Sequence, residues 1–324
     1  MSKSYAAALT AIALIVAAPA ARAQTGSWGS DAPAASSAAS SAAPPSPEQI
    51  AQAQARFMAS LTKRTGVIRL PRANASLNLG EKYYFLGEAD SRRVIVDVWR
   101  NPPDVADGVM GMVFPAGATP FDENGWGAVV TYLGSGYVSD KDARKTNYDD
   151  VLKQLREGEE HDNEERKKQN FPQIRLVGWG QPPSYDPVRH SLAWARELQF
   201  GDETDHSLNY DVRVLGRKGV LSLNIVSVMS QLPRLRGAAV DLQSTAGFDA
   251  GSRYADFQPG VDKRAAYGLA GLILAGAGLA VVKKAGLIAV ALLFLKKGIA
   301  VIIAALAGGW AWLRRKFGGR KAAS

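Results

Sequence analysis

Four apolar stretches in the second half of the chain follow one another, and the last two links between them are short and polar. The link GDETDH (201–206) joins the second stretch to the third, and GRKG (216–219) joins the third to the fourth. Hairpin-like spacing of this kind predicts a β-meander. The four predicted strands are Ile174–Trp179, Ser191–Phe200, Leu208–Leu215 and Val220–Val226.

Shorter β-like runs and a few helical patterns precede and follow the meander. The runs Val109–Phe114 and Trp126–Tyr132 are expected to pair with each other. Other predicted strands are Val67–Leu70, Ala75–Leu79 and Tyr83–Leu86, and predicted helices cover residues 46–62, 89–99, 139–170 and 229–243. No strand–helix–strand alternation runs through the chain. The fold class is therefore expected to be α+β, with a mainly antiparallel sheet, a few helices and a C-terminal transmembrane helical segment.

The N-terminal region indicates export. Residues 1–23 carry Lys3, an apolar run and the small-x-small sequence Ala21-Arg22-Ala23, as a signal peptide does. An uncleaved anchor is the alternative. Residues 24–45 are rich in Ala, Ser and Pro, so they are expected to form a low-complexity linker. A helical lead-in (46–64) and an exported α+β domain (65–257) follow.

The C-terminal region is apolar and basic, which predicts a membrane anchor at 265–313 and a basic tail at 314–324. Ala265–Val282 is uncharged over 18 residues, and a helix of that length spans roughly 27 Å against a hydrocarbon core of about 30 Å. Lys/Arg clusters favour the cytoplasm, so an odd number of crossings is expected, with a two-span hairpin as the competitor. Small residues that could permit self-association, or that are merely common in spans, are Gly268, Gly271, Ala275 and Gly278.

The distribution of charge excludes a nucleic-acid partner. The net charge is +9, but eleven Lys/Arg and no Asp/Glu follow from Lys263 onward. Residues 24–262 hold 26 Lys/Arg and all 30 Asp/Glu, a net charge of −4. A mildly acidic body lacks the basic footprint that phosphate backbones require. The chain has no cysteine, which also excludes disulfides, thiolate metal sites and a cysteine nucleophile.

Several longer motifs resemble those of one known family. They are NPPD (101–104), GYVSDKDA (136–143), ERKKQNFP (165–172), GWGQPPSYD (178–186), LNYDVRVLGRKGVL (208–221) and GSRYADFQPGVDKRAAYG (251–268). Over roughly residues 65–280 the chain resembles the DUF2167 family of uncharacterised membrane-anchored proteins. The resemblance implies an exported domain with a C-terminal membrane anchor. It implies no activity and supplies no catalytic residues.

Motifs for catalysis or metal binding are few. The three histidines, His161, His190 and His206, lack the spacing of zinc ligands. Asp140-Lys141-Asp142 fails as a calcium loop because Arg144 replaces an oxygen ligand. A weak calcium site at residues 202–205 competes with an ordinary polar turn, which is favoured. No cofactor and no metal are predicted.

The segment GWGQPPSYDPVRHSLAW (178–194) concentrates the candidate site residues, and three interpretations of it remain open. The prolines could fix a stiff corner, with Trp179 ending one strand, Trp194 beginning the next and Tyr185 between them. A groove for a ligand or partner could use Trp179, Tyr185, Asp186, His190 and Trp194. Catalysis could use His190 oriented by Asp186, with Tyr185 as a donor.

Together these features predict a non-enzymatic module in the periplasm, anchored in the bacterial inner membrane and binding an envelope protein or polymer. The alternative is an envelope hydrolase that uses His190 with Asp186 or Tyr185.

Overall fold

The computed structural model describes residues 46–275, except for the side chain of His161. The predicted signal peptide (1–23), the linker (24–45), the anchor from residue 276 onward and the basic tail (314–324) lie outside the described residues, as does Gly278.

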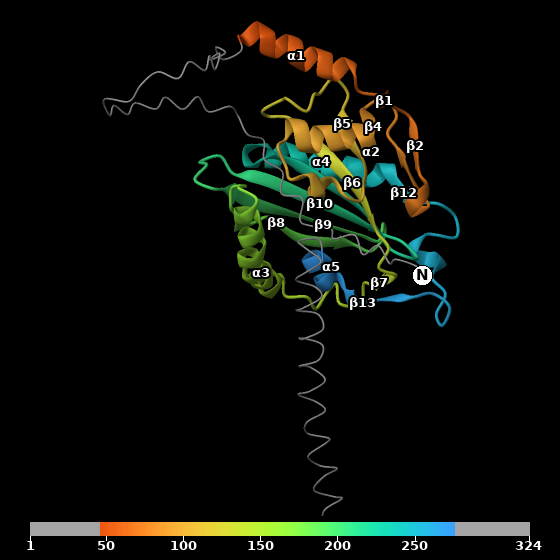
Figure 1. Ribbon diagram of the computed structural model, residues 1–324. Helices are drawn as coiled ribbons and strands as arrows, with labels where there is room; N and C mark the ends of the chain where they lie inside the picture. The colour runs from red at the N-terminus through yellow and green to blue at the C-terminus, as the bar shows by residue number, and fades with distance from the viewer. Residues whose placement is uncertain (1–45, 276–324) are drawn as a thin grey trace, which may run out of the picture.

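An antiparallel sheet of eight strands forms the centre of the described domain (Figure 1). The predicted meander is confirmed, because β8, β9, β10 and β11 lie side by side in chain order and all their pairings are antiparallel. Across the sheet the strands are β1 (Lys63–Arg64), β4 (Tyr83–Gly87), β5 (Val109–Pro115), β6 (Gly127–Leu133), β11 (Val220–Val228), β10 (Ser207–Leu215), β9 (Ser191–Phe200) and β8 (Ile174–Asp186).

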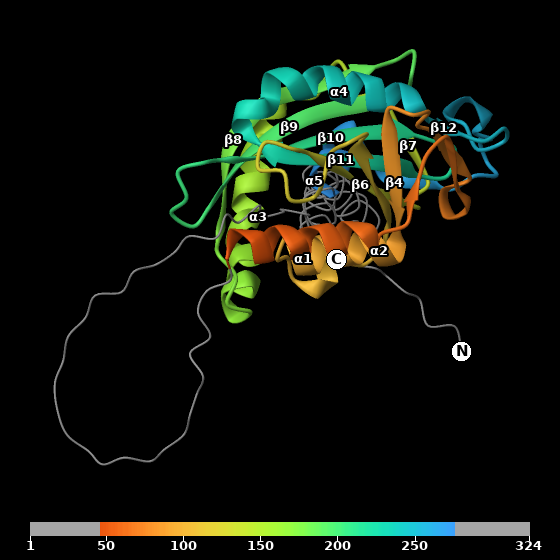
Figure 2. The same cartoon turned by 90° about the horizontal axis from the view of Figure 1, so that it is seen from above.

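One face of this sheet is covered by α4 (Leu232–Thr245) and by a small three-stranded sheet. The small sheet contains β2 (Val67–Leu70), β3 (Ala75–Asn78) and β12 (Ala246–Phe248). Figure 2 shows α4 lying along the strands, with β12 at its end. Leu235 and Leu242 of α4 are fully buried against the sheet. This burial explains why the weak helical pattern of residues 229–243 becomes a stable helix.

The opposite face is covered in two places. Near β4 and β5, α2 (Glu88–Arg93) continues into a π-helical turn (Val94–Val98) that buries Val94 and Ile95. Near β8 and β9 the cover consists of α3 (Tyr148–Lys168) and α5 (Leu269–Ala275). Because both faces are covered, every residue of β10 is buried. The half-buried strand expected at 191–200 is therefore covered on both sides as well.

A proline corner after Trp179 is not present. Pro182 and Pro183 lie inside β8, which runs unbroken to Asp186 with register shifts on both sides of Gln181. This strand is at the edge of the sheet. An edge strand needs no outward hydrogen bond, and bulges accommodate the missing N–H, so proline is tolerated there. The turn lies instead between Asp186 and Ser191.

At its N-terminus the described domain begins with α1 (Pro47–Ala59), which starts at a capping box. The Ser46 hydroxyl accepts a hydrogen bond from the Gln49 backbone N–H, and the Gln49 side chain accepts one from the Ser46 N–H. No residue of α1 is buried. The helix therefore lies on the outside of the domain, as Figure 1 shows.

The C-terminal boundary of the domain also differs from the prediction. The expected domain ends at residue 257 and the expected anchor starts at 265, but β13 (Arg264–Gly268) pairs in parallel with β7 (Tyr137–Ser139). Leu269 and Leu272 of α5 are then fully buried among the residues of α3 and β9. Residues 264–275 thus belong to the folded domain. Within residues 46–275, no helix combines the length and apolar character needed to cross a membrane.

The small residues predicted to mediate self-association are used inside the domain. Ala275 is 1% exposed, and a Cβ on Gly271 would lie 2.4 Å from the Cβ of Tyr267. A Cβ on Gly268 would collide with the Asp142 carboxylate. These three positions are small because neighbouring parts of the same domain approach them closely.

Candidate functional site

The turn between β8 and β9 positions the sequence-predicted residues Asp186 and His190. Asp186 Oδ1 accepts hydrogen bonds from the backbone N–H groups of Val188 (2.8 Å) and Arg189 (3.1 Å). The Arg189 guanidinium donates to Asp186 Oδ2 at 2.9 Å, and these bonds from Arg189 lower the pKa of the Asp186 carboxyl. Asp186 therefore shapes the turn and does not orient His190. His190 closes the turn with a φ of 48°, in the left-handed region.

His190 contacts Tyr185 and Asp140 instead. The Tyr185 hydroxyl donates to Asp140 Oδ2 at 2.7 Å, and His190 Nδ1 lies 3.2 Å from the same hydroxyl oxygen. His190 Nδ1 is 3.9 Å from Asp140 Oδ2. We call these three residues the Asp140 cluster. The His190 side chain is 34% exposed and that of Asp140 is 29% exposed, so the cluster is at the surface.

The protonation states follow from the hydrogen bonds. Burial raises the pKa of Tyr185, and the hydrogen bond to the Asp140 carboxylate raises it further. The hydroxyl consequently keeps its proton and donates a hydrogen bond to Asp140. Its oxygen can then only accept, which assigns the His190 proton to Nδ1 in the neutral imidazole. Tyr185 is therefore a poor nucleophile, because the phenolate that would attack a substrate is disfavoured.

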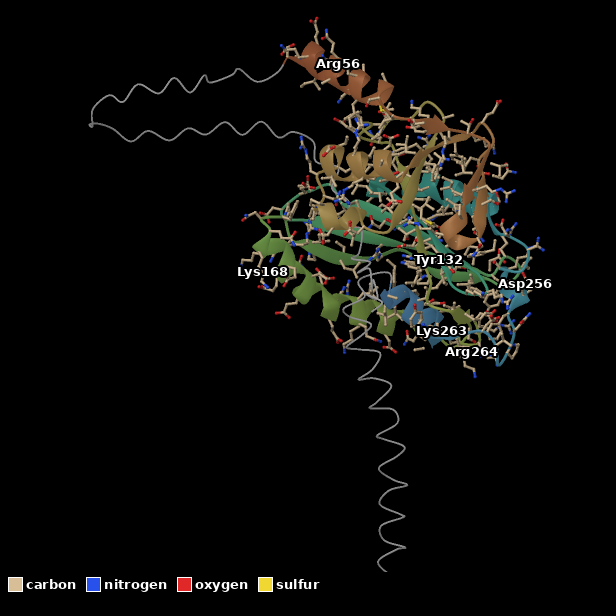
Figure 3. All side chains as sticks on the ribbon, turned by 45° about the vertical axis from the view of Figure 1, so that its right-hand side comes forward. Arg56, Tyr132, Lys168, Asp256, Lys263 and Arg264 are labelled. Carbon is tan, nitrogen blue, oxygen red and sulfur yellow. The ribbon has the colours of Figure 1, made fainter. Side chains whose placement is uncertain are left out.

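A stack of aromatic rings extends from His190 and ends at an arginine. His190 stacks on Tyr254 (4.3 Å between ring centroids), Tyr254 on Tyr137 (4.5 Å), and Tyr137 on Phe257 (3.9 Å). The Arg264 guanidinium lies 4.5 Å from the Phe257 centroid. Figure 3 labels Arg264 at the lower side of the molecule. We call this arrangement the aromatic column; its rings come from the β8–β9 turn, β7, η5 (Tyr254–Asp256) and the loop before β13.

The column and the Asp140 cluster share a backbone contact. The Asp140 N–H donates to the Tyr254 hydroxyl at 3.2 Å. The two inner rings, Tyr254 and Tyr137, each stack against two other rings. The ring contacts of the column hold four chain segments together. Over the described residues, no group of three His, Asp or Glu is placed to hold a metal ion.

The two tryptophans of the candidate segment lie elsewhere. Trp179 is half-buried, and its indole N–H donates to the Tyr148 carbonyl at the start of α3 (3.3 Å). Trp194 is 1% exposed and lies under the Arg213 guanidinium at 5.4 Å. A side chain buried to that degree cannot contact a partner, which conflicts with its predicted role. Of the five predicted residues, the structure brings together Tyr185 and His190 and places Asp186 beside them in the turn.

Sequence reasoning missed Asp140 and the column residues Tyr137 and Tyr254. All three lie in the quoted motifs, but 45 residues separate Asp140 from Tyr185. No spacing rule connects residues so far apart in the chain. No feature of the sequence indicated that these three residues meet in the fold.

A pocket lies between the β2–β3 hairpin and β4, and it was also missed. Its volume is about 350 Å³. Its lining residues are Arg64, Arg69, Leu70, Pro71, Arg72, Phe85, Gly87, Glu88 and Met110. Three of these side chains are guanidinium groups and one is a carboxylate. We call this site the arginine pocket.

Comparison with known proteins relates the domain, apart from α1, to one family model. The model, described as "Protein of unknown function (DUF2167)", matches residues 62–307. Among solved structures, the solution structure of cyanobacterial PsbP (CyanoP) from Synechocystis sp. PCC 6803 is 10% identical. The match covers 59% of this chain and 94% of that chain, with a TM-score of 0.32. No curated protein is similar enough to count as a match.

Proposed function

Since this chain belongs to the DUF2167 family, a family described only as being of unknown function, we propose that its domain is a non-enzymatic binding module of the bacterial cell envelope. In this proposal the domain is exported to the periplasm and tethered to the inner membrane by its C-terminal segment. The signal-peptide pattern of residues 1–23 and the apolar, lysine-flanked segments after Ala275 support the export and the tether.

The observation that carries the proposal is the way the C-terminal segment is held. The aromatic column ties Tyr254, Phe257 and Arg264 to the β8–β9 turn, and β13 is paired with β7. Arg217 adds a two-point ion pair to Asp262, with N–O distances of 2.7 and 3.0 Å. The segment that continues towards the tether therefore starts from a fixed point on the domain. Such a joint suits a module that presents one side at a constant orientation to the membrane.

The same observation argues against catalysis at His190. Its ring is stacked on Tyr254, its Nδ1 proton is directed at Tyr185, and that hydroxyl is directed at Asp140. These groups therefore hold the C-terminal segment of the domain against the β8–β9 turn. The arginine pocket, by contrast, is a concave site whose charged groups are accessible, and it supports a binding role.

Location can be tested with single thiols, because the chain contains no cysteine. Val67 is 62% exposed and Val261 is 75% exposed. We expect Val67→Cys and Val261→Cys of the full chain to react with a membrane-impermeant maleimide in intact cells. A cysteine appended after Ser324 should react only after lysis, which tests the predicted odd number of crossings. If Val67→Cys and Val261→Cys both required lysis, the periplasmic location would be wrong.

A hydrolase that uses His190 remains the second candidate, because the hydrogen-bonded series Asp140–Tyr185–His190 has the form of a proton relay. The variant His190→Asn separates the two functions. Asparagine tolerates the φ of 48° and can still donate to Tyr185, but it cannot act as a base. We expect His190→Asn to fold like the wild type, and we expect no turnover of chromogenic ester or peptide probes that depends on His190. Turnover lost in His190→Asn would favour the hydrolase.

A further inference from the structure

We infer that the arginine pocket binds the oxyanion group, carboxylate or phosphate, of a small organic ligand. The inference names a ligand class for the binding role proposed above and in that sense rests on it. The pocket volume of about 350 Å³ is within the range of small-molecule sites, which runs from about 300 to 1,000 Å³.

The charges lining the pocket favour an anion. Arg64, Arg69 and Arg72 contribute three positive charges, and Glu88 contributes the only carboxylate of the lining. Glu88 Oε2 lies 3.5 Å from Arg72 Nη2 and so offsets one guanidinium. Outside the lining, Asp249 reaches Arg69 only at 4.0 Å, with both side chains largely exposed. At least one guanidinium charge is left without a carboxylate partner.

Arg64 is the clearest case of an uncompensated charge. Its guanidinium lies 4.9 Å from the centroid of the Phe85 ring, and no ion pair to it occurs within residues 46–275. The cation–π contact holds the guanidinium over the ring while its N–H groups stay free to donate. Such a group is oriented before a ligand arrives, which reduces the entropy lost on binding.

Arg72 is also oriented, by a different contact. Its Nη2 donates to the backbone carbonyl of Val109 at 3.1 Å, which holds the side chain across the start of β5. All the cations of the pocket are arginines and none is a lysine. The planar guanidinium fork matches the two oxygens of a carboxylate or phosphate, whereas an ammonium group is a point charge.

The remaining lining predicts that the ligand has an apolar part next to its charge. Pro71, which is exposed, and Met110, which is 9% exposed, form the accessible apolar wall of the pocket, whereas Leu70 and Phe85 are almost fully buried. An apolar group placed against this wall is removed from water, which contributes to affinity in proportion to the area covered. The preferred ligand therefore combines an oxyanion with a small hydrophobic moiety.

Isothermal titration of the detergent-solubilised full chain tests the inference, in a buffer free of competing oxyanions. Inorganic phosphate, acetate and benzoate are the three probes. We expect benzoate to bind more tightly than acetate if the apolar wall contributes, and phosphate to bind if three guanidiniums are the main determinant. Either result supports the pocket, and the comparison of the two identifies the oxyanion.

Variants locate the binding. Arg64→Gln and Arg69→Gln should each raise the Kd about fivefold to tenfold, the scale of one charge-assisted hydrogen bond. Glu88→Gln should lower it by about threefold, because Arg72 is then free to bind the ligand. Arg56→Gln is the matched control. Arg56 lies on the exposed helix α1 (Figure 3), so this variant removes the same charge outside the pocket and should leave the Kd unchanged.

Two results would overturn the inference. One is the absence of binding for all three probes; the other is an equal loss of affinity in Arg64→Gln and Arg56→Gln, which would indicate general charge screening. The lining arginines are exposed, so these variants should fold, and circular dichroism of each checks this. The titration uses purified protein and does not depend on location in the cell. Its failure is therefore distinguishable from failure of the thiol-labelling test.

Discussion

The carboxylate of Asp142 caps the helix that begins at Leu269, 127 residues later in the chain. Its Oδ1 accepts a hydrogen bond from the Leu269 backbone N–H at 3.1 Å, and its Oδ2 lies 3.4 Å from the N–H of Ala270. The first N–H groups of a helix have no partner within the helix, so a carboxylate at this place satisfies them. Asp142, which sequence analysis weighed as a calcium ligand, has this structural role instead.

Removal of this cap should destabilise the domain. We expect Asp142→Ala to lower the free energy of unfolding by about 1 kcal/mol, the typical cost of losing a side-chain cap. Asp142→Asn should lower it by less, since the amide oxygen can still accept one N–H. Asp202→Ala, in the exposed loop 201–206, is the control for loss of an acidic charge. Urea titration followed by fluorescence gives all three values, and equal effects of Asp142→Ala and Asp202→Ala would contradict the capping role.

The burial of α5 predicts that its apolar residues stabilise the domain. Leu272 is fully buried, and we expect Leu272→Ala to cost about 2–5 kcal/mol, the range for such truncations in a packed core. Val240, on α4, is 62% exposed, so Val240→Ala should change the free energy of unfolding by less than about 0.5 kcal/mol. Thermal unfolding of the full chain distinguishes them. If Leu272→Ala left the free energy of unfolding unchanged, α5 would not be part of the core.

Shortening the chain addresses the same boundary. A chain that ends at residue 257 lacks β13 and α5 and exposes the apolar residues that α5 covers, including Leu192 and Trp194. We expect it to aggregate or unfold at lower temperature than a chain of residues 46–275, as measured by light scattering during a thermal ramp. Equal stability of the two chains would support residue 257, the boundary predicted from the sequence, as the end of the domain.

Stability should fall at alkaline pH because several tyrosines keep their protons in the folded state. Burial raises the pKa of Tyr83, Tyr84, Tyr185 and Tyr254. Below the unfolded pKa of about 10 both states are protonated, and the stability is fully present. Above it the unfolded chain loses these protons while the folded chain retains them, so the free energy of unfolding decreases as pH rises.

The contribution of Asp140 can be tested separately. In Asp140→Asn the carboxylate that opposes ionisation of Tyr185 and of Tyr254 is gone, so the pKa of both tyrosines should fall. Ultraviolet titration of tyrosinate should then show native-state ionisation at a lower pH than in the wild type. Asp186→Asn removes a nearby carboxylate that makes no hydrogen bond to the Tyr185 hydroxyl, so it should lower the pKa of Tyr185 by less. Identical titrations of wild type and Asp140→Asn would refute the assignment.

Alanine substitutions at two glycines should change the stability of the domain in opposite directions. Gly237 lies inside α4 with nothing within 4 Å of an added Cβ, so Gly237→Ala should stabilise the domain by about 0.5–1 kcal/mol. A Cβ on Gly111 would lie 2.6 Å from the Leu86 carbonyl oxygen and would collide with the edge of the Phe85 ring. Gly111→Ala should therefore destabilise by about 1–3 kcal/mol. Calorimetric melting temperatures should move in opposite directions.

The parts of the fold that were predictable depend on local pattern. The links at 201–206 and 216–219 are too short for anything but hairpins, and the Ser46 capping box marks the start of α1. The strand through Pro182 and Pro183 was missed, because proline disfavours a strand interior but is accepted at an edge. Edge position is a property of the whole sheet and cannot be seen in one segment.

The site was less predictable than the sheet. Asp186 is four residues from His190, so the sequence suggests that the two are partners. The Asp186 carboxylate instead accepts hydrogen bonds from backbone N–H groups of the turn. Asp140, which directly follows β7, is brought near His190 by tertiary packing. The predicted start of the anchor at residue 265 was wrong for a related reason. An apolar run such as Leu269–Ala275 has the same composition whether it enters a core or a membrane.

The pairing of β13 with β7 means that the domain cannot finish folding until residues 264–268 have been synthesised. Residues 137–139 leave the ribosome well before their partners at 264–268, and the layer under α3 lacks Leu269 and Leu272 until those residues have also been synthesised. During that interval Leu192 and Trp194 are exposed on an unfinished surface. Contacts between residues so distant in the chain form slowly, and such surfaces aggregate readily. The domain thus completes its core only after residues 264–275 have been synthesised, so the apolar surface under α3 stays open to aggregation until α5 has docked.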